Sequence, residues 1–397
     1  MIFRSERLDS VIMEARTLLK KALYAWIVFF SLPASAIAAG FQMADQGPKA
    51  VGMGGAFTAV ADDASALWYN PAGIAFQPGG QVMLGGNAII ARGRDFEPNL
   101  NSAPGSSSTL TASRTHFLPQ AYISYYDEDW PFAFGIGINS PFHLSTEWPA
   151  SAPFTGAGKV AEINMFSFNP NVAVRFTEHF AAAVGASYYL VKDFEFANAT
   201  QSYQGDGDAF AVNVALLYKR QGWSVGGSYR SRSIRTRIEG LVGFAFPDQA
   251  NVGVAYRPYD NLQISVDAGW VDWQRNDVLR FRGASPFNLV LNWDSTFSAR
   301  AGVDWEINPV FRVRFGYAFD PTPINDIDFS PYVPDSDRHV VSIGLGYDLI
   351  DDLTFDFGYA FIFLVEHDQL NSADTTINGT YQSNKLHTLT GALSYRF

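Results

Sequence analysis

The chain has 397 residues, no cysteine and a formal net charge of −11 at pH 7. The lack of cysteine excludes disulfide scaffolds, Cys-ligated metals and thiol chemistry, and the acidic balance disfavours nucleic acid, whose phosphates require clustered Lys and Arg. Only 17% of the residues are charged, against about 25% in typical soluble proteins, whereas 33 Phe, 18 Tyr and 9 Trp make the chain rich in aromatic side chains.

The first 38 residues are predicted to be a cleavable signal peptide. A basic stretch precedes an apolar run at 22–32, and small residues then lead to an A-x-A site at 36–38. This order is typical of secretory signals. The apolar run is shorter than the ~20 residues that a spanning helix requires, which disfavours the alternative of a membrane anchor. We therefore expect the chain to be exported from residue 39 onward.

Residues 39–80 show no strand pattern and consist mainly of Ala, Gly and small polar residues. We expect a short helix within 57–67. A second helix is predicted after Asn70, because Asn caps helices well and Pro71 suits the first helical position, where no backbone N–H is needed. The low charge of the segment suits burial better than solvent.

From residue 81 onward, apolar and polar residues alternate with the period of two that a β-strand requires. In 353–363, every odd position is Leu, Phe or Tyr, and most even positions are Thr, Asp, Gly or Ala. The alternating stretches are about ten to eighteen residues long and end in aromatic residues, which is typical of a lipid-facing band between aromatic girdles. The predicted fold class is all-β, a transmembrane 14-stranded antiparallel β-barrel at 81–397.

Short connections alternate with longer ones, as periplasmic turns alternate with extracellular loops in such barrels. An even number of strands places both ends of the barrel on the periplasmic side. The predicted strands are 81–94, 116–126, 131–139, 163–176, 179–195, 209–219, 222–239, 248–257, 261–273, 288–306, 310–319, 338–349, 353–363 and 385–397.

A barrel of this size has a lumen wider than its own side chains fill, so it contains water, a ligand or a plug. We therefore predict that 39–80 is an N-terminal hatch inside the lumen, with a periplasmic tail as the alternative. The last strand ends at Phe397. A C-terminal Phe on such a strand resembles the signal read by the outer-membrane barrel assembly machinery, which is an expected partner.

Several motifs resemble the FadL/TodX family of outer-membrane transporters of hydrophobic compounds. Two of them correspond to the family's hatch, one to its third strand and the exit from that strand, and one to the loop before its twelfth strand. In that order they are the AGFQ sequence with Phe41, Asn70-Pro71-Ala72-Gly73, the segment 135–142, and Pro334-Asp335 followed by Asp337-Arg338.

The resemblance implies passive uptake of a hydrophobic small molecule by a monomer in outer-membrane lipid, without a cofactor or metal. The molecule is caught by extracellular loops, enters an apolar lumen pocket, is released by hatch movement and leaves sideways at a kink in the third strand. Gly135, Gly137 and Pro141 are the residues that weaken or kink that strand here. The alternative is that these glycines allow close packing against the hatch.

The chain departs from the fatty-acid members of the family after the fifth strand. Their long insertion, which helps to form a surface groove, is replaced by a short polar stretch at 196–208. The loop at 140–162 is then the candidate for first capture of the ligand, with a simply packed loop as the alternative. Its candidate contact residues are Phe142, Leu144, Trp148 and Phe154.

Those members also place a Lys before an Asp on the tenth strand to meet a carboxylate, whereas this chain has Trp293 before Asp294. Trp suits an uncharged ligand, although the strand alternation offers a lipid-facing alternative for it. A carboxylate would have to be met by another basic residue, unless these residues are only structural charges facing the lumen. The candidates are Lys192, Arg235, Arg237, Arg282 and Arg300.

Two other functions are alternatives to transport. A general diffusion porin needs no plug, so the segment 39–80 disfavours it. An outer-membrane enzyme requires an acid–base or nucleophile constellation, and none of the six histidines lies in a recognisable motif. The acidic pairs at 62–63 and 335–337 fit turn chemistry better than catalysis or Ca²⁺ binding. The choice among long-chain fatty acids, alkanes and monoaromatic hydrocarbons stays open.

Overall fold

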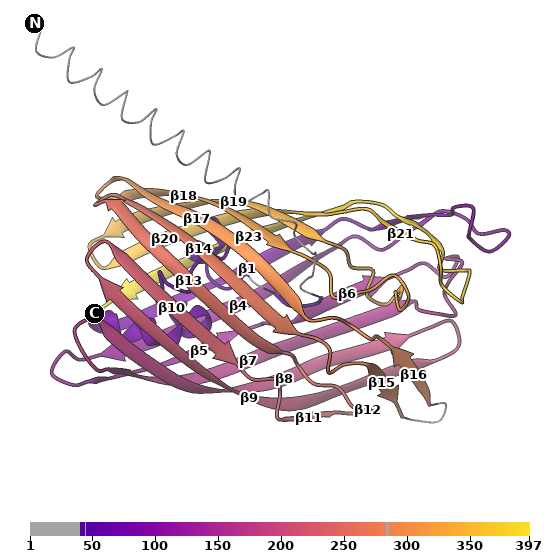
Figure 1. Cartoon of the computed structure of the whole chain (residues 1–397), viewed down its shortest axis with the longest axis horizontal. Helices are drawn as coiled ribbons and strands as arrows, with labels where there is room; N and C mark the ends of the chain where they lie inside the picture. Colours follow the sequence, from indigo (N-terminus) through magenta and orange to yellow (C-terminus); the bar gives the residue numbers. More distant parts are fainter. Residues whose placement is uncertain (1–39, 44, 283–285) are drawn as a thin grey trace, which may run out of the picture. The chain divides into compact units, whose positions relative to one another are not determined.

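The computed structural model describes residues 40–43, 45–282 and 286–397, so the predicted signal peptide lies outside the described residues. In this part of the chain, long antiparallel strands form a closed barrel with fourteen strand positions (Figure 1). The predicted fold class is therefore confirmed. In chain order the positions are β1 (Gly79–Ala91), β4 (Arg114–Tyr126), β5 (Phe132–Asn139) with β6 (His143–Glu147), β7 (Val160–Arg175), β8 (Phe180–Ala197), β9 (Ser202–Arg220), β10 (Trp223–Arg230) with β11 (Arg235–Ile238), β13 (Asp248–Tyr259), β14 (Leu262–Asp272), β17 (Thr296–Asn308), β18 (Phe311–Asp320), β19 (Arg338–Ile350), β20 (Leu353–Leu364) and β23 (Asn384–Arg396).

The first and last strands close the barrel. β1 pairs antiparallel with β23, from Gln81 opposite Arg396 to Ala91 opposite Leu386. Among the described residues, seven shorter strands lie in the long connections between the barrel strands. They are β2 (Asp95–Glu97), β3 (Thr109–Leu110), β12 (Leu241–Val242), β15 (Val278–Phe281), β16 (Phe287–Val290), β21 (His367–Gln369) and β22 (Gly379–Tyr381).

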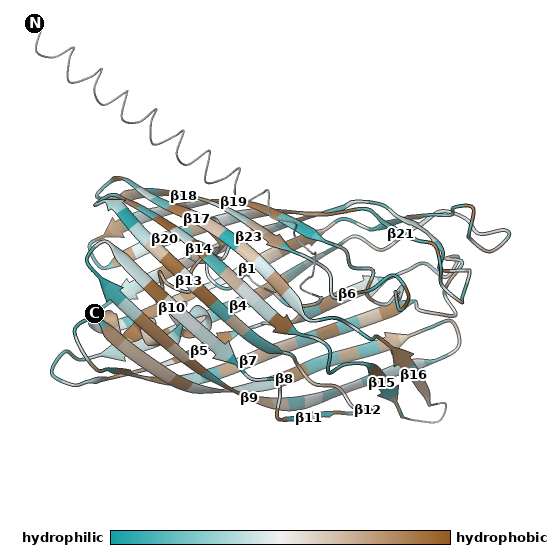
Figure 2. Ribbon diagram, in the orientation of Figure 1, coloured by the Kyte–Doolittle hydropathy of each residue, from teal (hydrophilic) through white to brown (hydrophobic). Residues whose placement is uncertain are grey.

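The outer surface of the barrel is apolar. Along the strands, hydrophobic and hydrophilic residues alternate (Figure 2), and the exposed residues include Leu84, Phe117 and Val252. The residues beside them in sequence point inward, where small and polar side chains predominate. An apolar outer band with a polar interior is the arrangement that a barrel in lipid requires.

Two of the predicted strands are interrupted. The strand expected at 288–306 is divided into β16 and β17, because Asn292 adopts a left-handed backbone (φ 42°) that ends the alternation. The strand expected at 222–239 is likewise divided into β10 and β11. At these two breaks the alternating pattern continues in the sequence, whereas the backbone leaves the ladder.

The hatch lies inside the ring of strands and contains α2 (Pro48–Gly52), α3 (Ala66–Tyr69) and the 3₁₀ helix η1 (Pro71–Phe76) (Figure 1). The helix start after Asn70 is confirmed. The helix expected within 57–67 was wrong for most of its length. The backbone N–H groups of Phe57 and Thr58 instead donate to the Asp267 carboxylate of the barrel wall, at 3.0 and 2.7 Å. Among the described residues, no helix is long and apolar enough to cross a membrane.

Candidate transport site

Asn70 joins the hatch to the barrel wall. Its side-chain oxygen accepts a hydrogen bond from the Ala72 N–H at 3.2 Å, which caps η1. Its amide nitrogen donates to the carbonyl oxygens of Thr58 (2.8 Å), in the hatch, and Leu216 (3.0 Å), on β9. The side chain is fully buried, so these three bonds replace all contact with water.

The remaining residues of the Asn-Pro-Ala-Gly motif are explained by packing. Pro71 occupies the first position of η1, and Ala72 is fully buried behind it. A Cβ atom on Gly73 would lie 2.3 Å from the carbonyl oxygen of Ala61, so no side chain fits there. The motif therefore fixes a tight contact between two turns of the hatch.

We expect Asn70→Ala to loosen the hatch. Loss of the buried partners costs about 1–3 kcal/mol, which corresponds to opening that is roughly 5 to 150 times more frequent. Hydrogen exchange of peptides covering 66–77, followed by mass spectrometry, measures this opening. Asn101→Ala, at an exposed loop position, is the matched control. Equal exchange rates in the Asn70 variant and the wild type would contradict the assigned role.

The third barrel strand is broken between β5 and β6. At the break, the chain next to the hatch supplies the missing hydrogen bonds. The His143 N–H donates to the Phe41 carbonyl at 3.0 Å, and the Met43 N–H donates to the Pro141 carbonyl at 2.8 Å. We call residues 41–43 and 45–46 the N-terminal segment. Its backbone therefore holds the kinked part of the third strand.

A gap in the strand ladder lies beside this break. Residues 121–126 of β4 pair with β5, whereas 114–120 have ladder partners on β1 alone. In the described ladders β6 is joined to β7, and no ladder joins it to β4. We call the space between 114–120 and β6 the lateral gap. It is a place where the barrel wall is not closed by backbone hydrogen bonds.

Contacts of another kind span the lateral gap. The rings of His116 on β4 and His143 on β6 lie with their centroids 4.4 Å apart. Closer to the loops, the Arg114 guanidinium pairs with the Glu147 carboxylate, and the N–H of Ala112 donates to the Glu147 carbonyl at 2.8 Å. Two side-chain contacts and a single backbone hydrogen bond separate more easily than a full ladder of backbone bonds.

The predicted exit glycines pack closely on the interior. A Cβ atom on Gly135 would lie 2.7 Å from the side chain of Leu67 in the hatch, and one on Gly137 would lie 3.1 Å from the Tyr122 ring. Close packing against the hatch and β4 therefore accounts for these two residues. Pro141, in contrast, lies at the strand break itself.

A cavity lies behind the lateral gap, and we call it the apolar cavity. His116, His143 and Leu144 line it on the side of the gap, and Phe41 lines it from the N-terminal segment. Further apolar side chains from β1, β20 and β23 complete this part of the wall. They are Ile89, Ile362, Leu364 and Leu386.

Charged groups also face the apolar cavity. Arg94 is buried and bonds the carbonyl oxygens of Val365 and Tyr381, and burial lowers its pKa to about 10. Burial likewise raises the pKa of Asp45 to about 6. These groups make the cavity amphipathic, so its chemistry accommodates an apolar chain with or without a polar end.

The Pro-Asp-x-Asp-Arg motif holds the rim of this cavity. Arg338 donates to the Asp335 carboxylate at 2.7 Å and also to the Gly40 carbonyl at the start of the described chain. Asp337 accepts from the Thr322 N–H at 2.9 Å, which fixes the preceding loop, and Pro334 lines the cavity. The motif therefore joins a loop and β19 to the chain next to the hatch.

Phe41 also contacts a cluster of buried aromatic rings. Its ring centroid lies 4.7 Å from Trp273, 5.9 Å from Trp293 and 6.0 Å from Phe142. Trp293 is only 2% exposed, so it points into the lumen and the lipid-facing alternative for it was wrong. The reversal follows from the break at Asn292, which changes the phase of the alternation.

The loop residues expected to capture ligand are buried in the same cluster. Phe142, Trp148 and Phe154 are 0% exposed, and Leu144 is 9% exposed. The Trp148 indole N–H donates to the Pro331 carbonyl at 2.9 Å, which ties this loop to the one before β19. These side chains therefore form the packed interior beneath the loops and are not displayed at the surface.

The basic residues predicted as candidates for a carboxylate are mostly exposed. Lys192, at an irregular point of β8, is exposed, and so are Arg235, Arg237 and Arg282. Arg300 alone among these candidates is directed inward, where it pairs with Asp320 at 2.9 Å. Two buried basic residues, Arg230 and Arg94, were not among the predicted site residues; they are 6% and 2% exposed. The inward phase of β10 is the signal that would have identified Arg230.

A buried ion network seats the hatch on the opposite wall. The Lys49 ammonium of α2 lies 2.9 Å from Asp62 in the hatch and 3.2 Å from Asp304 on β17. Burial of Asp62 opposes its ionisation, but the Lys49 ammonium, with a further contribution from Lys219, more than offsets this effect and lowers the pKa of Asp62 to about 2. In the described part of the chain, no group of three or more His, Asp or Glu residues is arranged to hold a metal ion.

Comparison with known proteins agrees with this architecture. A family model described as outer membrane protein transport protein (OMPP1/FadL/TodX) matches residues 30–194 and 181–397. The long-chain fatty acid transport protein of Salmonella typhi is 22% identical over 414 residues, which cover 88% of this chain and 93% of that protein.

Two solved structures share the fold. The FadL homologue of Pseudomonas aeruginosa has a TM-score of 0.71 at 17% identity and covers 90% of this chain and 100% of its own. The toluene transporter TodX of Pseudomonas putida has a TM-score of 0.67 at 16% identity, and the match covers 88% of this chain and 98% of TodX. The chain belongs to the OMPP1/FadL/TodX family, whose members are outer-membrane β-barrels that transport hydrophobic compounds.

Proposed function

We propose that this protein carries hydrophobic small molecules, either long-chain fatty acids or hydrocarbons, passively across the outer membrane and into its lipid. Relatives named for long-chain fatty acid transport and for toluene transport support this range of substrates. The protein acts as a monomer without a cofactor. Its insertion depends on recognition of Phe397 by the barrel assembly machinery, and the 65% exposure of that side chain suits such recognition.

The observation that carries the proposal is the lateral gap with the apolar cavity directly behind it. A molecule held beside Phe41 lies next to His116 and His143, the two side chains whose contact closes the gap. Separation of the two rings opens a path from the cavity to the lipid outside the barrel. Pro141 supports the proposal because it lies at the break that leaves β6 unpaired with β4.

The hatch controls this path through the N-terminal segment. The segment bonds the carbonyl of Pro141 and the N–H of His143, and Gln46 also donates from its side chain to the Ser140 carbonyl at 3.0 Å. A shift of the segment therefore removes the hydrogen bonds that hold the kinked strand. It also withdraws Phe41 from the cavity wall, so release of the ligand and opening of the exit occur together.

A sideways exit suits an apolar solute for a physical reason. Each buried CH₂ group is worth about 0.8 kcal/mol relative to water, so a chain that crossed a wet lumen would lose most of its binding energy. Passage from an apolar cavity into lipid keeps the solute out of water throughout. The concentration gradient is then a sufficient driving force.

The proposal is tested by uptake in a bacterial strain that lacks its own transporter of this family. Cells producing the protein are expected to accumulate radiolabelled oleate or toluene faster than cells with the empty vector. Liposomes containing the purified protein are expected to swell no faster in sugar solutions than protein-free liposomes. Rapid sugar entry without a gain for either hydrophobic compound would replace the proposal with a general diffusion porin.

A further inference from the structure

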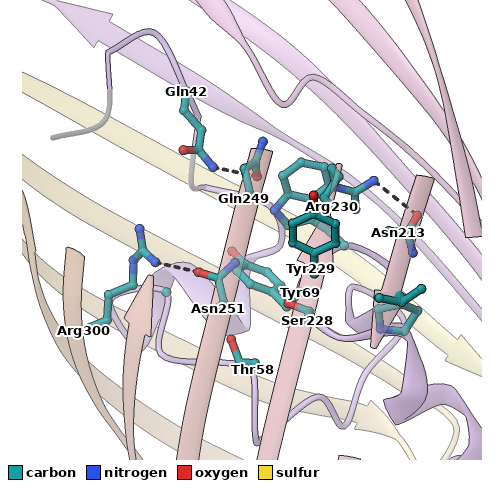
Figure 3. A pocket seen from close by; sticks show the side chains of 14 residues that line it. Gln42, Thr58, Tyr69, Asn213, Ser228, Tyr229, Arg230, Gln249, Asn251 and Arg300 are labelled. Atoms are coloured by element: carbon teal, nitrogen blue, oxygen red, sulfur yellow. Dashed lines mark hydrogen bonds between the residues drawn. The ribbon is translucent and has the colours of Figure 1, made fainter. Parts of the chain in front are cut away.

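A second cavity lies between the hatch and the barrel wall (Figure 3). The hatch contributes Thr58, Trp68 and Tyr69, and the wall contributes side chains from β9, β10, β13 and β17. Unlike the apolar cavity, it is lined mainly by polar groups, and we call it the polar cavity. Its lining includes Gln42, Asn213, Ser228, Arg230, Gln249, Asn251 and Arg300.

Arg230 brings a buried charge to the polar cavity without an acidic partner. The side chain is 6% exposed, and its guanidinium carbon lies 4.3 Å from the ring centroid of Trp68. Its hydrogen bonds go to neutral acceptors, the hydroxyl of Ser187 and the amide oxygens of Asn213 and Asn169, the latter two both at 3.5 Å. Among the described residues, no carboxylate lies within 4.0 Å of it.

An unpaired charge at this depth is unfavourable, because burial removes water without replacing its stabilisation. The neutral acceptors and the Trp68 ring offset only a part of this loss. Arg300, the other cation of the cavity, already pairs with Asp320. The cavity therefore has an excess of one positive charge.

An independent observation indicates that donors outnumber acceptors in the same place. Gln249 is 4% exposed, and its side-chain oxygen accepts from Gln42 at 3.0 Å. Its buried Nε2 has no hydrogen-bond partner. A carboxylate is an acceptor on both oxygens and carries one negative charge, so it matches the unpaired guanidinium and the unused amide together.

We propose that the polar cavity is a carboxylate-binding site in which Arg230 holds the anion. Gln42 lines both the polar and the apolar cavity, so the two adjoin at this residue. The carboxylate belongs either to a small free acid or to the end of an amphipathic molecule whose chain extends past Gln42. The assignment does not depend on the lateral route proposed above, because Arg230 and Gln249, which carry it, do not lie at the lateral gap.

The test is a binding titration of the full-length purified protein in detergent, followed by ligand-observed NMR. Acetate and hexanoate are the probes, and hexanamide is the neutral isostere. We expect saturable binding of acetate, weaker by at least about tenfold in Arg230→Gln and retained in Arg230→Lys, which keeps the charge. Arg220→Gln, at an exposed end of β9, is the matched control and should bind like the wild type.

The two sources are distinguished by comparing the probes. Hexanoate that binds at least about tenfold more tightly than acetate, with both dependent on Arg230, assigns the site to the end of an amphipathic molecule. Equal affinities assign it to a small free acid. Circular dichroism verifies that each variant retains the barrel.

Absence of saturable binding by either acid, or equal binding in Arg230→Gln, would overturn the assignment and leave a water-filled cavity. Hexanamide binding as tightly as hexanoate would overturn it as well. Uptake of toluene measures the proposed transport separately. A variant that no longer binds acetate but still takes up toluene would show that the carboxylate site and the proposed transport are independent.

Discussion

A double variant carrying His116→Cys and His143→Cys is expected to take up toluene normally when reduced, and at least about tenfold more slowly once a short bifunctional reagent joins the two thiols. The native rings lie 4.4 Å apart across the lateral gap, so a short linker spans it. The linker supplies the connection that the strand ladder lacks there. If the ligand leaves between β4 and β6, a covalent bridge at this point closes the exit.

The chain is well suited to this experiment because it contains no cysteine, so the two introduced thiols are the only ones. Cleavage of the linker by a reductant should restore uptake, which separates closure of the exit from damage to the barrel. A matched control joins Val254→Cys to Val266→Cys, a pair directly opposite on β13 and β14 where the ladder is already closed.

Uptake that is unaffected by the linker between residues 116 and 143 would exclude the lateral gap as the exit, and the ligand would then leave through the lumen. Slower uptake in the linked Val254–Val266 control would point to general stiffening of the barrel. Only the combination of a blocked gap and an unaffected control supports the proposed route.

The barrel could be predicted from the sequence because its pattern is local. In the strand predicted at 353–363, the polarity of each residue indicates whether its side chain faces out of the barrel or into it. The observed strand, β20, covers Leu353–Leu364. The prediction failed where the backbone left the ladder. Asn292 adopts a left-handed conformation, of which the alternating sequence pattern gives no sign. The pattern therefore allowed a lipid-facing position for Trp293, although the structure buries it.

The site could be predicted only in part, because its main features join residues that are distant in sequence. The Asn-Pro-Ala-Gly motif identified the hatch, but the bond from Asn70 to Leu216 spans 146 residues. The lateral gap arises from the absence of pairing between β4 and β6, for which no local pattern exists. Arg230 is at an inward-facing position in the alternation of β10, which the sequence shows. That no carboxylate lies beside it among the described residues depends on the fold.

In the ion network that seats the hatch, Lys49→Met is expected to destabilise the closed hatch by about 1–3 kcal/mol, because Asp62 is partly exposed and Asp304 keeps Arg314. Lys49 lies between Asp62 and Asp304, and its removal takes from Asp62, whose side chain is 29% exposed, its ion-pair partner, whereas Asp304 keeps Arg314 at 3.2 Å. Hydrogen exchange of peptides covering α2 measures the change. Lys385→Met, at an exposed position, is the control and should have little effect.

The pH dependence of the closed hatch provides a second test of this network. The folded pKa of Asp62, about 2, lies below its ordinary value of 3.8, so its contribution is present above that value and is lost as the pH falls toward 2. Removal of Lys49 abolishes the main cause of the lowered pKa. In Lys49→Met the pKa of Asp62 should rise, because only Lys219 and Arg314 then act against the effect of burial. Acidification should then restore protection of the hatch, because a protonated carboxyl needs no cation. A variant whose exchange stays as slow as that of the wild type at neutral pH would show that the network does not hold the hatch closed.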